Sequence, residues 1–83
     1  MHSIRVLPSG MRDLDALEKS VFDRVRAKIL MLQDSPRPAG SVKLTATEGY
    51  RIRAGDYRIL YRVDDRKKIV FIYRVKHRKE AYR

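Results

Sequence analysis

Arginine recurs in three stretches of the C-terminal half of the chain that have a pattern of period two, residues 50–53, 57–63 and 69–78. A period of two is typical of β-strands, because successive side chains of a strand point to opposite faces of the sheet. One face of the predicted sheet then carries seven cationic side chains: Arg51, Arg53, Arg58, Arg62, Arg74, Lys76 and Arg78. Guanidinium groups bind phosphate oxygens in pairs and stack on nucleobases, so we expect this basic face to bind a phosphodiester chain.

Composition agrees with a polyanionic partner. The chain has 83 residues, with 20 Lys and Arg against 10 Asp and Glu, and a formal net charge of +10 at pH 7. A chain of this length forms one domain, which excludes a two-domain enzyme. Charges on a solvent face could serve solubility alone. Their clustering on one face favours binding instead, and Tyr82 near the chain end could stack on a base.

Several classes of chemistry are excluded by residue type. The chain has no cysteine, so it forms no disulfide and has no thiolate nucleophile or sulfur-ligated metal. Its two histidines, His2 and His77, are too few for a histidine metal cage. The longest apolar run, residues 69–73, is far shorter than the roughly 20 residues that cross a bilayer, and the first residues lack a signal-peptide pattern. We expect a cytoplasmic protein without a metal, cofactor or membrane partner.

The N-terminal part predicts elements that support the basic sheet. Residues 3–7 are β-compatible and predict an edge strand, closed by a turn at residues 8–10. Three apolar residues at intervals of three predict a short helix over residues 11–17.

A second, longer helix is predicted over residues 21–32 from an apolar stripe at helical spacing. Ser20 and Asp23 are spaced as a capping pair at its start. The proline-containing loop 36–47 follows, with one short extended piece around residues 42–44.

Strand parity assigns the two faces of the predicted sheet. Turns at residues 54–56 and 64–66 join three antiparallel strands. The rows expected to face the helices are Tyr50 and Ile52, then Tyr57, Ile59, Tyr61 and Val63, then Ile69, Phe71, Tyr73 and Val75. By the same count Leu60, Val70 and Ile72 lie on the basic face. The sequence therefore predicts a single α+β domain over residues 1–83, in the order β-α-α-β-β-β, with a two-helix hairpin packed on one face of an antiparallel sheet.

Two segments resemble the RelE/ParE superfamily of bacterial type II toxins: GYRIRAGDYRILYRVDD (residues 49–65) and VKHRKEAYR (residues 75–83). The resemblance covers nearly the whole chain, and its most specific parts are YRIRAGDYRILY and HRKEAY. The basic pair before the turn and the terminal Arg and Tyr are similar to the RelE branch, whose members cleave mRNA in the ribosomal A site. The ParE branch, which poisons DNA gyrase, generally lacks the terminal pair.

The resemblance implies roles for five catalytic residues. Arg51 and Arg53 occupy the places of two basic residues, commonly lysines, before the turn. Arg58 is implied to bind the scissile phosphate. Arg78 is implied to help protonate the leaving oxygen, and Tyr82 to stack on the substrate base. The other residues expected to bind RNA are Arg62, Arg74, Lys76, His77 and Lys79.

The implied reaction is attack by the RNA 2′-hydroxyl on the adjacent phosphorus, which expels the 5′-oxygen and leaves a 2′,3′-cyclic phosphate without a metal. Arginine keeps its proton, so Arg51 cannot act as a general base. His77 has a suitable unperturbed pKa of about 6.5, but parity turns it away from Arg78 unless the strand ends near Lys76. Glu48 has the opposite parity to Arg51. The base is therefore unassigned, which suits an enzyme that depends on the ribosome to bend its substrate.

The resemblance also implies partners: a cognate antitoxin that covers the basic face, together with mRNA and the ribosome. The expected function is a toxin of a type II toxin-antitoxin system that inhibits translation as an endoribonuclease and arrests growth. An antitoxin could bury Leu60, Val70 and Ile72. Two alternatives stay open: a ParE-like gyrase inhibitor without nuclease activity, and a non-catalytic module that binds RNA or the ribosome.

Overall fold

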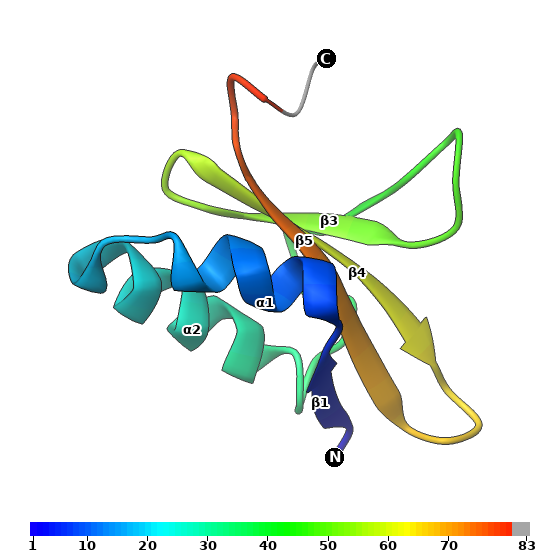
Figure 1. The fold of residues 1–83 in the computed structure, drawn as a ribbon. Helices are drawn as coiled ribbons and strands as arrows, with labels where there is room; N and C mark the ends of the chain where they lie inside the picture. Colours follow the sequence, from blue (N-terminus) through cyan, green and yellow to red (C-terminus); the bar gives the residue numbers. More distant parts are fainter. Residues whose placement is uncertain (81–83) are drawn as a thin grey trace.

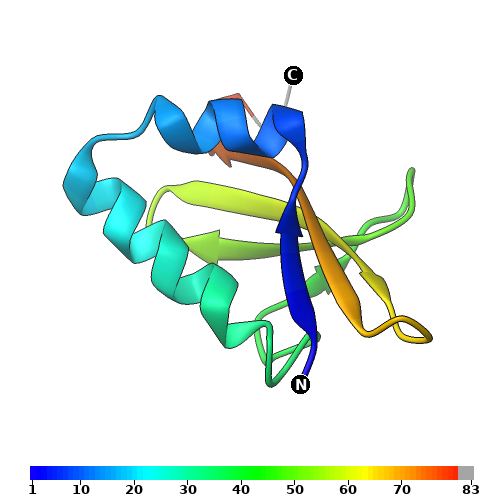
Figure 2. The same ribbon diagram turned by 60° about the horizontal axis from the view of Figure 1, so that its bottom comes forward.

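The structure is a computed structural model that describes residues 1–80. Its elements follow in the order β1 (Ser3–Val6), α1 (Pro8–Asp15), α2 (Lys19–Met31), β2 (Val42–Lys43), β3 (Tyr50–Ala54), β4 (Tyr57–Asp64) and β5 (Ile69–His77). The strands form one sheet in the order β1-β5-β4-β3-β2. Both helices cover the same face of this sheet (Figures 1 and 2). No helix within residues 1–80 is long and apolar enough to span a bilayer.

The predicted α+β class and two-layer arrangement are confirmed. The sheet is mixed rather than wholly antiparallel, because β1 pairs with β5 in parallel while the other neighbours are antiparallel. As expected, β1 lies at an edge. The extended piece expected in the long loop is β2, the strand at the opposite edge.

Both helices begin earlier than predicted. Pro8 occupies the first turn of α1, where its fixed φ is favourable and its missing N–H has no helical partner in any case. The predicted capping pair of α2 is wrong, since the cap residue is Glu18 and it makes no side-chain cap bond. Ser20 lies inside the helix, and Asp23 pairs with Lys19 across one turn at 3.1 Å.

The core lies between the helices and the sheet. Its fully buried side chains come from α2 and its cap (Val25, Leu32) and from the strands (Ile59, Tyr61, Val70, Ile72). Helix α1 packs directly over β5 at Gly10, where an added Cβ would lie 2.8 Å from the Ile72 carbonyl oxygen. This close approach requires glycine and fixes α1 against β5.

A β-bulge in β5 overturns the predicted parity of residues 69–73. Leu60 pairs with Arg74, but the next residue of β4, Tyr61, pairs with Ile72, so Tyr73 is the extra residue. The shift turns Ile72 and Val70 into the core, where both are fully buried. It leaves Phe71 and Tyr73 on the other face, which we call the open face. The expectation that Val70 and Ile72 lie exposed there is therefore wrong.

Beyond the end of β1, side chains of α1 form hydrogen bonds with backbone groups at the edge of β5. The Ser9 hydroxyl donates to the Tyr73 carbonyl at 2.6 Å. The Val75 N–H and the Arg74 Nε both donate to Asp13 Oδ2 at 2.8 Å. These bonds hold the bulge residue Tyr73 and the two residues that follow it, and buried backbone groups of this kind need such partners. Helix α1 therefore holds the bulge in place.

A second cluster, which we call the polar anchor, joins the N-terminus, the loop after α2 and the turn between β4 and β5. Arg37 donates to both carboxylate oxygens of Asp65, at 2.8 and 3.2 Å, and to the Tyr50 hydroxyl at 2.8 Å. His2 Nε2 lies 3.5 Å from Asp65. Hydrogen bonds from Arg37 lower the pKa of Asp65 and, reciprocally, raise the pKa of Arg37.

Candidate nucleic-acid interface

Three of the expected catalytic arginines line one recess on the open face. Arg51 and Arg53 come from β3 and Arg58 from β4, and together with Gly40 and Val42 they enclose about 190 Å³. Arg53 lies opposite Arg58 in the strand register, so the two side chains leave the same side of the sheet. We call this site the arginine recess.

The arginines differ in depth. Arg58 is only 7% exposed, Arg51 is half-buried and Arg53 is exposed. Among residues 1–80, no carboxylate lies within 4.0 Å of the Arg51 or Arg53 guanidinium. Cations gathered in a partly enclosed recess attract an anion more strongly than the same charges in water. The recess is therefore suited to a phosphate group.

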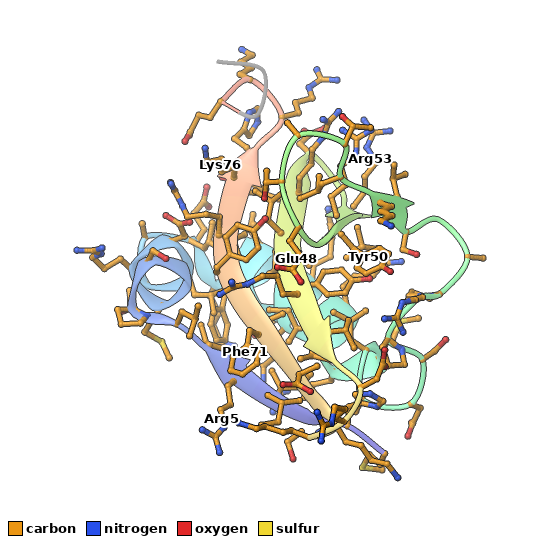
Figure 3. The ribbon with its side chains drawn as sticks, turned by 90° about the vertical axis from the view of Figure 1, so that its right-hand side faces the viewer. Arg5, Glu48, Tyr50, Arg53, Phe71 and Lys76 are labelled. Atoms are coloured by element: carbon orange, nitrogen blue, oxygen red, sulfur yellow. The ribbon has the colours of Figure 1, made fainter. Side chains whose placement is uncertain are left out.

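Three further cations lie in β5 or directly after it. Lys76 of β5 lies opposite Arg58 in the register, and Figure 3 shows Lys76 and Arg53 toward the same end of the molecule. Arg78 is held at the turn between β3 and β4, because its N–H donates to the Asp56 carbonyl at 2.7 Å and its Nε lies 3.9 Å from the Asp56 carboxylate. Lys79 is exposed in the turn after β5.

Two of the expected RNA-binding residues point elsewhere. His77 is still part of β5, lies opposite Tyr57 and packs edge-on against its ring at 5.2 Å. Its Nδ1 accepts the Lys79 N–H at 3.2 Å. Arg74 is paired with Asp13 of α1. Tyr82 lies outside the described residues.

Beside the expected Arg62, the middle of the open face holds three residues that sequence reasoning did not place there: Thr47, Glu48 and Tyr73. Arg62 extends toward the Tyr73 ring, with its guanidinium carbon 5.7 Å from the ring centre. Thr47 and Glu48, from the loop between β2 and β3, line the same hollow of about 290 Å³ as Arg62 and Tyr73. Figure 3 places Glu48 near the centre of this face. Alternation alone could not find Tyr73, because only the bulge turns it outward.

Toward the turn between β4 and β5, the open face has a wider groove. About 540 Å³ is enclosed by apolar residues, among them Leu7 and Phe71, and by charged residues that include Arg62 and Asp64. Phe71 therefore takes the place that the sequence assigned to Val70 and Ile72, while Leu60 is half-buried as part of the open face.

The chemistry available in the arginine recess is charge stabilisation rather than proton transfer. Guanidinium groups donate hydrogen bonds and stay protonated. His77 packs against Tyr57 on the helix side of the sheet, and Glu48 lines the hollow beside Arg62 rather than the recess. Within the described part of the chain, no group of three His, Asp or Glu side chains could hold a metal ion.

Solved structures of toxins and their complexes are similar to the chain over almost its whole length. The toxin-antitoxin complex RelBE2 from Mycobacterium tuberculosis is 30% identical to it, with a TM-score of 0.81 and coverage of 92% of this chain and 96% of that chain. The RelE-RelB complex from Pyrococcus horikoshii is 25% identical, with a TM-score of 0.78 and coverage of 93% and 94%. The isolated E. coli RelE toxin is 23% identical, with a TM-score of 0.80 and coverage of 99% and 96%, and this likeness shows the fold alone.

No curated protein sequence matches the chain. The family described as "ParE toxin of type II toxin-antitoxin system, parDE" matches residues 4–82, which is almost every residue of it. The expected resemblance is therefore confirmed at the level of the superfamily. The chain belongs to the ParE toxin family, within the RelE/ParE superfamily of type II toxins.

Proposed function

We propose that this toxin is a metal-independent endoribonuclease that cleaves mRNA in the ribosomal A site and so inhibits translation. The observation that carries the proposal is the arginine recess, where Arg51, Arg53 and Arg58 surround one space. Their guanidinium groups supply the hydrogen-bond donors that a phosphodiester under attack requires.

The reaction begins with attack of the 2′-hydroxyl on the adjacent phosphorus. The new O–P bond forms as the bond to the 5′-oxygen breaks. The products are a 2′,3′-cyclic phosphate and a 5′-hydroxyl, so that overall one proton passes from the 2′-oxygen to the 5′-oxygen. Arg58 binds the phosphate at the base of the recess, and Arg51 and Arg53 stabilise the charge that grows on its oxygens. Preorganised donors of this kind are worth about 10² to 10³ in rate each. Arg78 assists the leaving oxygen, and Tyr82 stacks on the neighbouring base.

Dependence on the ribosome follows from the groups that the recess contains. Arginine cannot accept the 2′-hydroxyl proton, and the His77 ring packs against Tyr57 on the other side of β5. The toxin therefore contributes positioning and charge, while the ribosome holds the mRNA in the bent geometry that in-line attack needs.

The proposed partner in the resting state is an antitoxin protein. Similar structures from M. tuberculosis and P. horikoshii are toxin-antitoxin complexes. This chain has a net charge of +10, and the half-buried Phe71 lines the wide groove of its open face. An antitoxin segment with acidic residues and apolar anchors would neutralise the positive charge and cover Phe71.

Primer extension on a defined transcript tests the nuclease proposal. The toxin is added to a translation reaction, and the same RNA without ribosomes is treated in parallel. Discrete stops inside the reading frame, found only during translation, are the expected result. Equal cutting of free RNA would contradict the dependence on the ribosome, and intact mRNA in both reactions would contradict the nuclease.

The match to the ParE family favours a second candidate, inhibition of DNA gyrase. Supercoiling of a relaxed plasmid by purified gyrase, with and without the toxin, tests this candidate directly. Loss of supercoiling together with intact mRNA would favour gyrase inhibition over the nuclease.

An Arg78→Ala variant that keeps ribosome binding but no longer arrests translation would separate catalysis from binding alone.

A further inference from the structure

The hollow formed by Thr47, Glu48, Arg62 and Tyr73 has the parts of a nucleobase site. It lies on the open face and encloses about 290 Å³. Bases of single-stranded RNA are bound by stacking on aromatic rings or guanidinium planes and by hydrogen bonds to their edges. Tyr73 and Arg62 supply the stacking surfaces here, and Thr47 and Glu48 supply polar groups.

The bulge and α1 fix the stacking side of the hollow. Tyr73 is the extra residue of the bulge, and its carbonyl accepts the Ser9 hydroxyl at 2.6 Å. The Arg62 guanidinium lies 5.7 Å from the Tyr73 ring centre, within reach of a cation–π contact. A planar base can therefore stack on a surface that the backbone holds in place.

The backbone also fixes the position of the loop that supplies the polar side of the hollow. Gly49 has φ +120° and accepts the Leu44 N–H at 2.9 Å. An added Cβ on Gly49 would lie 2.5 Å from the Tyr61 carbonyl oxygen, so the loop is in close contact with β4 at this point. Only glycine fits there, and the contact fixes the position of the backbone at the preceding residue, Glu48.

The chemistry of Glu48 selects among the four bases. Its carboxylate only accepts hydrogen bonds, and within the described residues it has no ion-pair partner within 4.0 Å. Guanine offers two neighbouring donors, N1–H and the N2 amino group, to the two oxygens of one carboxylate. On the same edge, adenine, cytosine and uracil each place an acceptor beside their donor, which a carboxylate repels.

The hollow lies at a useful distance from the arginine recess. Arg58 and Arg62 are on the same face of β4 and four residues apart, which is about 13 Å at the usual rise of a strand. A strand of RNA with one phosphate in the recess can place a nearby base in the hollow.

We propose that this hollow is a guanine-reading subsite, in which Glu48 binds the Watson–Crick edge of a base stacked against Tyr73 and Arg62. The subsite gives the toxin a preference for guanine at one fixed position relative to the cut. This inference rests on the proposed function for its role in cleavage, but it also predicts base-selective binding that needs no cleavage.

The binding test uses short labelled RNAs with 2′-O-methyl groups, which prevent 2′-hydroxyl attack, and four versions that differ in one base. Fluorescence anisotropy with the full chain should show about 5- to 10-fold tighter binding of the guanine version, the lower part of the range for a bidentate base contact. Glu48→Gln should bring the four affinities together. Glu18→Gln makes the same charge change on an exposed residue at the start of α2 and should leave the preference unchanged.

The cleavage test uses reporter codons that differ in the same base. In Glu48→Gln the preference for guanine should fall while cleavage at the other bases persists. Tyr73→Leu should lower cleavage at all four bases, because it removes the stacking ring. Tyr73→Phe keeps the ring and should lower cleavage at none of them. A guanine preference that survives Glu48→Gln in both tests overturns the inference, as does an equal loss at every base. Intact mRNA with selective binding would instead refute the nuclease and leave the guanine subsite supported.

Discussion

Arginine serves two different purposes in two regions of the molecule. In the polar anchor and beside α1, Arg37 and Arg74 are paired with carboxylates of the same chain at 2.8 Å. In the arginine recess, by contrast, Arg51 and Arg53 have no carboxylate within 4.0 Å among residues 1–80. The paired arginines join distant segments, whereas Arg51 and Arg53 leave a positive potential for an external anion.

The difference separates binding cations from structural ones in a chain with 20 Lys and Arg residues. Counting basic residues on a face treats all of them alike. The neutralised ones add little to the field that a polyanion meets, because the nearby carboxylate cancels it. Substitutions in the arginine recess should therefore change function strongly and stability little. Substitutions in the pairs of Arg37 and Arg74 should change stability strongly and function little.

The largest expected effect is in the arginine recess. Arg58→Ala should lower mRNA cleavage in a translation reaction about 10²- to 10³-fold, since it removes a preorganised donor to the phosphate. Arg58→Lys keeps the charge but loses the paired geometry, so it should recover only part of the rate. Arg26→Ala on the exposed side of α2 is the control. A loss in Arg58→Ala no larger than in this control would contradict the role of the recess.

The next effect concerns a structural pair. Asp13→Ala removes the acceptor of both the Arg74 guanidinium and the Val75 N–H. The free energy of unfolding in urea should fall by about 2 kcal/mol, typical of hydrogen bonds that involve a charged group. Asp15→Ala, at an exposed position of the same helix, should change it much less. Equal effects of the two substitutions would mean that Asp13 does not hold the bulge.

A smaller effect should separate Arg53 from Arg37 directly. The logarithm of RNA affinity falls with the logarithm of salt concentration, with a slope of about 0.7 for each phosphate contacted on a single strand. Arg53→Ala should reduce this slope by about that amount, whereas Arg37→Ala should leave it unchanged and lower stability instead. Anisotropy titrations at several salt concentrations measure both. The same slope change in the two variants would remove the distinction between the two kinds of arginine.

The smallest effect is the pH dependence of the polar anchor. Arg37 lowers the pKa of Asp65, so its ionised form adds stability above the unfolded-state pKa of about 4. That contribution is lost as the pH falls through the lower, folded-state pKa. Asp65→Asn should therefore unfold more readily than wild type at pH 7, and the two should converge at low pH. Thermal unfolding of both, with Asp34→Asn as control, checks this; a gap independent of pH would contradict it.

Local alternation was enough to predict that the three arginines of the recess share one face of the sheet. Arg51, Arg53 and Arg58 lie within two neighbouring strands joined by a tight turn, so their parity depends on residues close in sequence. The helices could also be predicted from apolar spacing, although their starts could not. Pro8 favours a turn by its residue type but lies in the first turn of α1, and the spacing of Ser20 and Asp23 favours Ser20 as the cap of α2, which is Glu18 in the structure.

The residues beyond the recess depended on contacts between distant segments. Arg74 has the alternation of a binding residue, yet Asp13, 61 positions away, holds it against α1. Glu48 has the wrong parity for the recess, and its position over the sheet comes from the contact between Gly49 and β4. Neither result could be obtained from the spacing of residues along one strand.

The charge, the order of most elements and the side of β3 and β4 on which the arginines lie can be read from the sequence, because they follow from composition and from the pleat of single strands. Which residues of β5 face solvent depends on contacts that form only in the folded chain. A bulge is a property of the pairing between two strands, and this one is held by side chains of α1 on the far side of β5. One extra residue in that pairing buries Val70 and Ile72 and turns Tyr73 toward the site.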